Sequence, residues 1–387
     1  MPLEQREIRA TGSSISLTRF LAVLLKIGAV GFGGGMAVIA LMEDQLVRRR
    51  RLVSAEEFVH GVGLGQILGS FAVNTSVFLG YRLFGATGAV LAAGVFLAPS
   101  VALVILLSEL YFRYHTLPAL QGITAGLGPV AIALIVAAAW SIGRQVIRSW
   151  RQALVAIAAL AAGLLKLNAI WILFAAGAGG FLASRRRPGS EESLPLTRPG
   201  SRTGLALIGA VPLKAAMGVI VLTFLKTGLV FFGGGFALVP VLHHRLVSEL
   251  GWLTPKQFLD GVAISNLTPG PIAVLATFAG FKVGGTAGAL AATAALFVPA
   301  IVLMLLISRQ YMRLRDDDRV RRFLAGVNPA IVGLVSSAAL MLGGNTLVSW
   351  RGYFLSNLSL LLLVRFRWYP VLVLAIGAAT GYAGLLS

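Results

Sequence analysis

The sequence predicts an all-α polytopic membrane protein with two homologous helical repeats, and three observations support this fold class. Of the 387 residues, 57% are hydrophobic and only 12% are charged, about half the charged content of a soluble globular domain. Apolar stretches of about 20 residues, long enough to cross a bilayer, recur along the chain. Residues 20–140 align without a gap with residues 220–340, and 32 of the 121 positions are identical, which indicates an internal duplication.

The apolar stretches predict six helical segments in each half. In the first half we expect helices over residues 17–47, 58–81, 86–112, 119–141, 149–166 and 168–183. In the second half we expect them over residues 216–247, 258–281, 286–311, 323–345, 347–365 and 369–386. Residues 184–203 are rich in proline, serine, glycine and charge, as flexible polar linkers are. The expected organisation is an N-terminal transmembrane repeat (1–183), this linker, and a C-terminal transmembrane repeat (204–387).

The formal net charge of +19 comes from basic residues that gather at the ends of the apolar segments, as in the run Arg48 to Arg51. This placement is typical of positive-inside topology and of contact with anionic lipids, so we expect no nucleic-acid partner. Residues 1–16 lack the apolar core of a signal peptide, and we expect a cytoplasmic N-terminus. The chain has no cysteine, which excludes disulfides and thiolate metal sites.

Three of the expected helices carry backbone interruptions. The first segment of each half contains three consecutive glycines, which destabilise a helix by about 1 kcal/mol each. The second segment of the second half contains the sequence TPGP, where the first half has the weaker GQILGS at 65–70. We expect broken or re-entrant helices at these motifs, because irregular backbone at membrane depth survives only inside protein or beside a water-filled cavity.

Interrupted segments at matching positions of two repeats indicate the binding site of a transporter, where helix N-termini direct N–H groups at an anion. Close helix packing is the alternative for the glycines, and we prefer it for Gly85, Gly88, Gly285 and Gly288. The predicted substrate-binding residues lie on the interrupted segments: Lys26, Phe32, Gly33, Gly34, Gly35, Gln66, Asn74, Lys226, Phe232, Gly233, Gly234, Gly235, Asn266, Thr268, Pro269, Gly270 and Pro271. Because Asn74 has valine at the matching position 274, we expect one asymmetric site.

The charged members of this set have two open interpretations. Lys26 and Lys226 lie inside apolar segments, where they either offset the charge of a bound anion or extend to the membrane surface. Glu43, His60 and Asp260 are candidates for proton coupling, although for His60 and Asp260 we prefer a place at the membrane surface. Neighbouring helix residues point about 100° apart, so His243 and His244 predict an interfacial pair, not a metal site. We expect no metal and no cofactor.

Two stretches of the second half, FLKTGLVFFGGGFALVPVLHHRLV (224–247) and GWLTPKQFLDGVAISNLTPGPIAV (251–274), resemble the chromate ion transporter (CHR) family. GYRLFGATGAVLAAGVFLAPS (80–100) resembles the third helix of that family, and the likeness covers both halves, as in its long two-domain form. The resemblance implies chromate transport across the bacterial inner membrane, usually as efflux that gives resistance, with sulfate as the chemical mimic. The resemblance implies that the residues that act in this transport are the glycine motifs, Lys26, Lys226 and Pro269 to Pro271. Asn266 replaces the family's glutamine, and Gly69, Ser70 and Phe71 stand where the first half would carry PGP.

We therefore predict a gradient-coupled secondary transporter of chromate, since the sequence has no nucleotide-binding motif. The alternatives are a transporter of sulfate or another inorganic oxyanion, and an anion channel. A membrane enzyme is disfavoured because the chain lacks a catalytic constellation such as HExxH. A third alternative is a structural scaffold in the membrane, which a chromate-binding assay would distinguish from a transporter because a scaffold binds no chromate. The expected partners are the anion and a bilayer with anionic lipids. A homodimer is compatible with the fused halves but is not needed to build the site.

Overall fold

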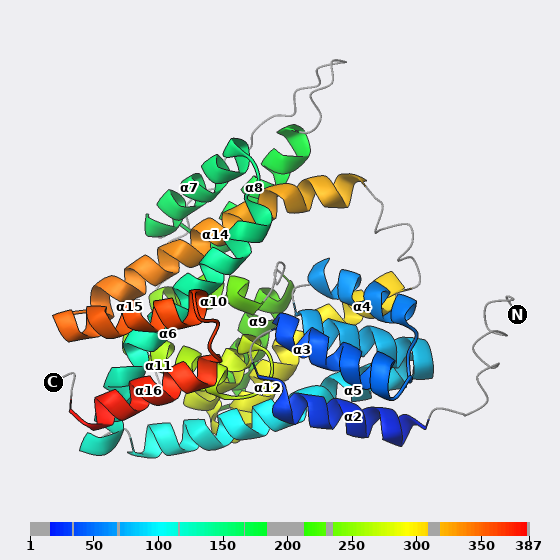
Figure 1. Cartoon of the computed structure of the whole chain (residues 1–387), viewed down its shortest axis with the longest axis horizontal. Helices are drawn as coiled ribbons and strands as arrows, with labels where there is room; N and C mark the ends of the chain where they lie inside the picture. Colours follow the sequence, from blue (N-terminus) through cyan, green and yellow to red (C-terminus); the bar gives the residue numbers. More distant parts are fainter. Residues whose placement is uncertain are drawn as a thin grey trace, which may run out of the picture.

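The computed structural model describes residues 16–32, 35–67, 70–114, 117–165, 167–183, 213–229, 235–308 and 318–384. Within these ranges every regular element is a helix (Figure 1). The linker expected at 184–203 lies outside the described residues. The stretches that are long and apolar enough to span a membrane are Phe71–Tyr114, Pro118–Val146, Ile272–Leu306 and Arg322–Gly344. This confirms the predicted class of helical membrane protein.

The helices of the first half are α2 (Leu17–Val30), α3 (Gly35–Met42), η2 (Glu43–Arg49), α4 (Ala55–Ile67), α5 (Phe71–Tyr114), α6 (Pro118–Val146), α7 (Trp150–Leu164) and α8 (Ala169–Ala183). The segment expected at 17–47 is interrupted after Val30, as its glycines predict. The segment expected at 58–81 is interrupted after Ile67, so the weaker sequence signal there also marks the end of a helix.

The second half repeats this order with α9 (Leu213–Leu229), η3 (Gly235–Ala237), α10 (Leu238–His243), η4 (His244–Glu249), α11 (Pro255–Leu267), η5 (Ile272–Val274), α12 (Leu275–Ser308), α14 (Asp318–Thr346), α15 (Trp350–Val364) and α16 (Pro370–Tyr382). Its first two expected segments are interrupted at the positions that correspond to those of the first half. The repeat is therefore structural as well as sequential.

Helices α5 and α12 each contain a sharp turn at a glycine. Gly85 has φ +69° and Gly285 has φ +58°, which are left-handed values that favour glycine. A Cβ on either residue would meet no atom within 4 Å, so the packing interpretation is wrong for these two positions. It is right for Gly88 and Gly288, because a Cβ there would overlap the carbonyl oxygen of a glycine eight residues earlier. Each long helix is thus a tight hairpin.

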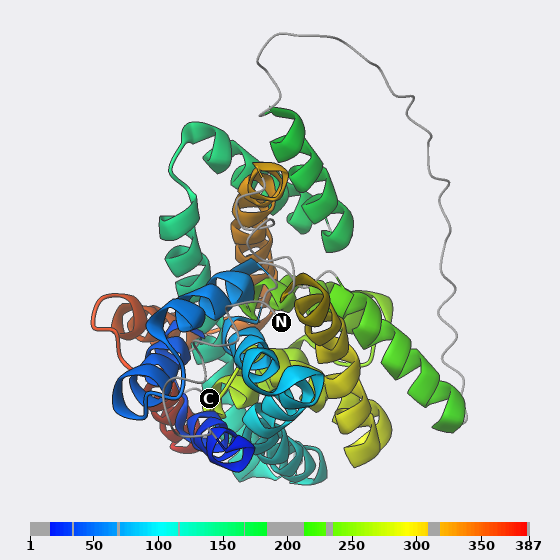
Figure 2. The ribbon, with the colours of Figure 1, turned by 90° about the vertical axis from the view of Figure 1, so that its right-hand side faces the viewer.

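The two repeats exchange their last two helices (Figures 1 and 2). Helices α7 and α8 of the first repeat pack on α14, and α15 and α16 of the second repeat pack on α6. Glycines allow both contacts: a Cβ on Gly126 would overlap the carbonyl of Gly377, and a Cβ on Gly326 would overlap the carbonyl of Ala176. The halves consequently share one helical body instead of forming two separate domains.

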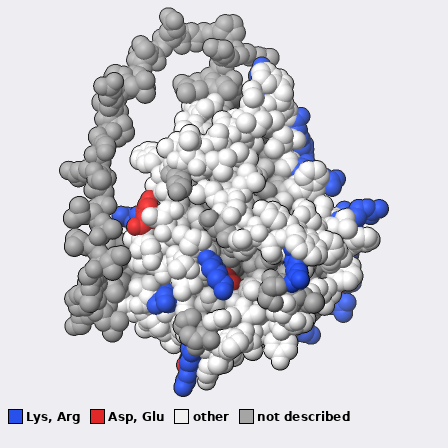
Figure 3. Space-filling model, turned by 90° about the vertical axis from the view of Figure 1, so that its left-hand side faces the viewer, with Lys and Arg blue, Asp and Glu red and all other residues white. Residues whose placement is uncertain are grey.

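The outer surface fits a membrane protein. On the face shown in Figure 3, scattered lysine and arginine side chains stand on a largely uncharged surface, with very few acidic side chains. Many exposed side chains are large and apolar, including Leu106, Trp140, Trp171 and Phe354. Such a surface suits contact with lipid acyl chains, and it is unlike that of a soluble protein.

Candidate functional site

The clearest interruption in the described helices is the loop Thr268–Pro271, which separates α11 from η5. Thr268 ends α11, and its hydroxyl donates to the carbonyl of Ser265 over 3.0 Å. Pro269 and Pro271 have no N–H group and cannot continue the helix. Gly270 has φ +108°, a conformation that side chains with a Cβ rarely adopt.

This loop of the second repeat is bound to the first repeat. The amide of Gly270 donates to the carbonyl of Gly31 over 3.0 Å, and Gly31 is the residue that caps the C-terminus of α2. The hydroxyl of Ser100 on α5 donates to the carbonyl of Pro269. A Cβ on Gly270 would overlap the Ser100 hydroxyl, so glycine is required here for space as well as for backbone angle.

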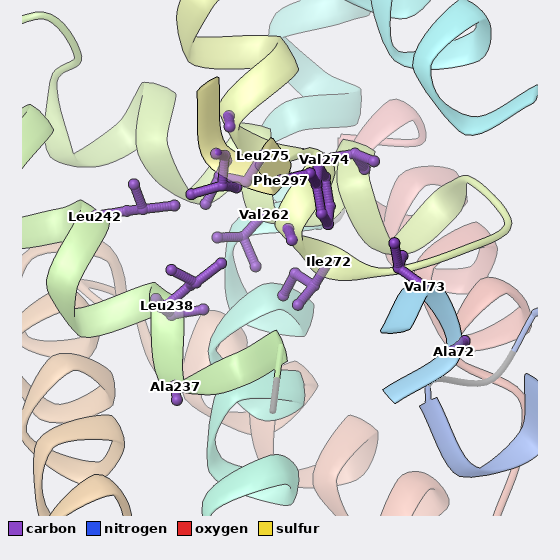
Figure 4. Packing of buried hydrophobic residues seen from close by; sticks show 14 of the residues in the cluster. Ala72, Val73, Ala237, Leu238, Leu242, Val262, Ile272, Val274, Leu275 and Phe297 are labelled. Carbon is purple, nitrogen blue, oxygen red and sulfur yellow. The ribbon is translucent and has the colours of Figure 1, made fainter. Parts of the chain in front are cut away.

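The glycine motif of the second repeat reaches the same loop from the other side. A Cβ on Gly235 would lie 2.8 Å from Cγ2 of Ile272, which directly follows the loop. Figure 4 shows Ile272 between Leu238 of the second repeat and Val73 at the start of α5. The structure therefore brings together one end of each glycine motif and the TPGP loop, an arrangement that we call the loop junction (Gly31, Phe32, Gly235 and Thr268–Pro271). Gly33, Gly34, Phe232, Gly233 and Gly234 lie outside the described residues.

The predicted polar residues occupy helices beside the loop junction. Asn74 is fully buried in the first part of α5. Asn266 is half-buried, and its side-chain amide donates to the carbonyl of Val262 one turn earlier on α11 over 2.8 Å. Thr268 is buried within the loop itself. Gln66 lies on α4, and its side chain is outside the described part of the structure.

Both predicted lysines lie on the outer face of their helices. Lys26 is exposed on α2, whose opposite face buries Phe20, Leu24 and Ile27. Lys226 is exposed on α9 in the equivalent position. Neither lysine lines one of the three cavities described below. This arrangement favours the alternative in which each side chain extends along the membrane to its polar surface.

The three coupling candidates have different environments. Glu43 forms a surface ion pair with Arg48 at 2.9 Å. His60 is half-buried on α4. Asp260 is 1% exposed, and its Oδ2 accepts a hydrogen bond of 2.7 Å from the hydroxyl of Tyr111. Asp260 is therefore buried at a contact between the two repeats, and its place at the membrane surface stays a prediction.

Asp260 lines a cavity that the sequence did not predict. The cavity has a volume of about 350 Å³ and lies between α6, the start of α11 and the start of α15. A second cavity of about 210 Å³ lies beside it and shares Thr124 and Lys256. Tyr111 could have been noticed in the sequence, because tyrosine recurs at the matching position 311. Lys256 carried no such signal, since its counterpart is Glu56.

The remaining histidines do not form a metal centre in the described part of the chain. The ring of His243 is buried edge-on against Phe258 with 5.2 Å between ring centroids. The Nε2 of His244 lies 3.0 Å from an oxygen of Glu249. His243 is buried and His244 is half-buried, and their place at the membrane interface stays a prediction. A third cavity, of about 30 Å³, lies beside them.

Comparisons with known proteins agree with the duplicated architecture. The chromate transporter family matches residues 18–181 and again residues 219–382. A half-length relative, the uncharacterized transporter YwrA of Bacillus subtilis, is 28% identical over 169 residues, which are 43% of this chain and 94% of that protein. No solved structure matches.

Two full-length relatives carry a function in their names. A protein of Synechococcus elongatus named "Probable chromate transport protein" is 32% identical over 339 residues, covering 86% of each chain. The chromate transport protein of Cupriavidus metallidurans is 28% identical over 378 residues, covering 95% of this chain and 93% of the relative. With two family matches that together span most of its length, this chain belongs to the chromate transporter family.

Proposed function

We propose that this protein is a secondary transporter that exports chromate across the bacterial inner membrane and thereby gives resistance to chromate. The observation that carries the proposal is the loop junction, where interrupted helices of two repeats meet in a member of this family. Transport proteins commonly bind their substrate at such breaks between repeats. The export direction is the usual one implied by the family resemblance.

The chemistry of the loop junction suits an oxyanion. The helical turn η3 begins at Gly235, and η5 with α12 begins directly after Pro271, so two helical N-termini start at this junction. The first N–H groups of a helix have no partner within that helix and carry its positive dipole end. Glycine backbone allows the oxygens of an anion to approach these N–H groups closely. Chromate and sulfate present the same tetrahedral set of acceptors, which is why sulfate is the natural competitor.

Two further features support coupling to a gradient. Moving one elementary charge through the membrane potential is worth about 2.3 kcal/mol per 100 mV, and an inside-negative potential favours the exit of an anion. Asp260 is the coupling candidate with a buried carboxyl group, whereas Glu43 is held in a surface ion pair. The basic residues at the ends of the apolar segments would concentrate anions and contact anionic lipids.

Flux through reconstituted liposomes tests the proposal. We would measure labelled chromate flux with and without a pH gradient and a membrane potential, and we would add sulfate as competitor. Accumulation of chromate against its gradient, reduced by sulfate, is the expected result. Sulfate flux without chromate flux would show that the transported anion is sulfate and not chromate. Passive equilibration alone would indicate a channel, and no flux of either anion would contradict the transporter function.

Substitutions in the glycine motifs test the site. Gly34→Val and Gly234→Val should each abolish chromate flux while the protein remains in the membrane, because a branched side chain would exclude the anion from the backbone N–H groups. Gly94→Val is the matched control, since a Cβ at Gly94 on α5 meets no atom within 4 Å. If both motif variants keep full chromate flux, the glycine motifs do not form part of the binding site.

A further inference from the structure

The side chain of Asp260 on α11 is enclosed at the contact between the two repeats. Only 1% of the residue is exposed, and its Oδ2 accepts a hydrogen bond of 2.7 Å from the hydroxyl of Tyr111 on α5. Because α5 belongs to the first repeat and α11 to the second, this bond links the repeats directly. Any movement of one repeat against the other at this place has to break it.

Aromatic packing from both repeats holds Tyr111 in position. Its ring lies 4.9 Å from that of Phe112 on α5 and 5.5 Å from that of Phe278 on α12, measured between centroids. Phe278 also packs on α11, because a Cβ on Gly261 would lie 2.6 Å from its Cδ1 atom. Water is therefore largely kept from this contact, and the tyrosine hydroxyl is the polar group presented to Asp260.

The carboxyl group of Asp260 has too few hydrogen bonds for an ionised group. A carboxylate offers about four acceptor positions, yet only Oδ2 has a partner in the described structure, while Oδ1 is buried without one. A buried charge is costly unless it is paired and hydrogen-bonded, and an acid in such a place takes up a proton instead. The enclosed carboxyl group is therefore neutral, with its proton on Oδ1.

No opposite charge replaces the missing hydrogen bonds. Lys256, one turn earlier on α11, is the charged group that acts on Asp260, and it is exposed and forms no ion pair with it. Helix α6 faces the carboxyl group with the uncharged Thr124, and the ammonium group of Lys282 on α12 lies over an aromatic ring. Among the described residues, charged side chains of α14 and α16 line neither cavity beside Asp260.

A second buried polar atom near this contact also lacks a partner. Ser108 lies three residues before Tyr111, on the same face of α5. It is fully buried, and its Oγ has no hydrogen-bond partner in the described structure. Unpaired buried polar atoms are costly, and each needs an explanation. Both atoms would gain partners if the contact opened to water in another conformation of the transporter.

We infer that Asp260 and Tyr111 form a proton-dependent latch between the two repeats, in which Asp260 holds one proton while Tyr111 covers it and releases that proton when the contact opens. On opening, the O–H bond of the carboxyl group breaks and the proton passes to water. The cavity of about 350 Å³ at whose wall Asp260 lies is a place from which water can enter. The ionised carboxylate then opposes closure until it binds a proton again.

This inference rests on the proposed function and deepens it, because it makes the proton the coupling ion and the contact between the repeats its place of action. A transporter built from two repeats exposes its site alternately by moving one part against the other. A latch that closes only when protonated ties this movement to the pH gradient. The first repeat has His60 at the matching position, so the carboxyl latch occurs once in the molecule.

Thiol labelling measures the opening of the latch without measuring transport. The chain has no cysteine, so Ser108→Cys introduces a single thiol of similar size beside the latch. Its labelling by a water-soluble maleimide should be about tenfold faster at about pH 8 than at about pH 6, once the pH dependence of thiol reactivity is removed, since one proton is released on opening. The same thiol in the Asp260→Asn background provides that correction.

Asp260→Asn tests the role of the proton. The amide is a permanent neutral substitute for the protonated carboxyl group and still accepts from Tyr111, so the latch should stay closed and labelling should stay slow at both pH values. In liposomes, the ratio of chromate flux with and without a pH gradient should fall to about one, whatever the absolute rate. Glu109→Gln, which removes an exposed acid from the same end of α5, is the matched control and should keep the wild-type ratio.

Tyr111→Phe tests the positioning role of the tyrosine. This substitution keeps the aromatic packing but removes the hydrogen bond that closes the latch. The closed, protonated form loses stability relative to the open form, so the rise in Ser108→Cys labelling should move to lower pH. An unchanged pH profile would show that Tyr111 only fills space.

The outcomes separate the latch from the proposed function. If labelling of Ser108→Cys, corrected with a small thiol in solution where Asp260→Asn is not recovered, does not depend on pH, the latch is overturned. Chromate flux by the wild type would still support transport in that case. If labelling follows pH as expected but the wild type carries neither chromate nor sulfate, the latch stands and the proposed function fails. A pH-gradient response of Asp260→Asn equal to that of the wild type would remove Asp260 from coupling.

Discussion

Individual residues at the contact between the repeats differ between the two halves. Ser100, which donates to the TPGP loop, corresponds to Ala300, and the buried Asp260 corresponds to the half-buried His60. The loop residue Gly270 itself corresponds to Ser70. Duplicated backbone thus carries different side chains where the halves meet. One asymmetric site instead of two equivalent ones therefore stays a prediction, and these differences are its basis.

Gly270→Ala should reduce chromate flux by about tenfold, because the substitution is strained twice. A non-glycine residue in a left-handed conformation costs about 1–2 kcal/mol, and the added Cβ would overlap the Ser100 hydroxyl. Ser100→Ala removes the overlapping hydroxyl but leaves the backbone strain at position 270. The double variant should therefore regain only part of the flux. Liposome flux of both single variants and the double variant measures this. Normal flux by Gly270→Ala alone would show that the loop tolerates rearrangement.

At the scale of helices, small residues determine how closely neighbouring elements approach. Gly126 on α6 lies against the backbone of α16, and Gly326 on α14 lies against the backbone of α8. These contacts occupy matching positions of the two repeats, so the same packing solution is used twice. The interrupted helices have a different role, since their breaks place polar backbone in the interior of the protein.

Gly126→Ala and Gly326→Ala should each destabilise the folded protein by about 1–3 kcal/mol, the usual cost of overpacking. Thermal unfolding in detergent should show a lower midpoint for both. Gly94→Ala is the control for helix propensity: with open space at its Cβ, it should leave the midpoint unchanged or raise it slightly. Equal midpoints for all three variants would contradict the close backbone contacts.

At the scale of the whole molecule, the exchange of terminal helices makes each repeat depend on the other. Helix α6 is covered by α15 and α16, and α14 is covered by α7 and α8. A separated half would expose the apolar surfaces that these partners bury. The connection through residues 184–203, by contrast, is expected to be a flexible linker.

Fragments 1–193 and 194–387 should therefore reconstitute chromate flux when they are produced together and give none when produced alone. Each fragment supplies the two helices that the other needs, and the cut falls in the expected linker. Flux and membrane abundance of the single fragments and of the pair provide the measurement. Transport by the first fragment alone would contradict roles for Asp260 and the TPGP loop, which it lacks.

The sequence by itself determined the class of protein, the duplication and the positions where helices stop. The low charge content and the long apolar segments reflect the lipid that surrounds the protein. Composition alone therefore reveals the class of protein. Consecutive glycines and prolines act locally on the backbone, and the breaks after Val30 and before Ile272 are therefore where the sequence predicts them. Local chemistry did not distinguish glycines that turn the chain, such as Gly85, from those that only allow packing, such as Gly88.

Only the tertiary structure decided which of the marked residues meet. The hydrogen bond from Tyr111 to Asp260 joins residues 149 positions apart, and no periodicity predicts such a contact. The same holds for Lys26 and Lys226, whose outward direction depends on which face of the helix its neighbours cover. Apolar patterning identifies buried faces in water, but in a membrane both faces are apolar, and packing alone decides which one points inward.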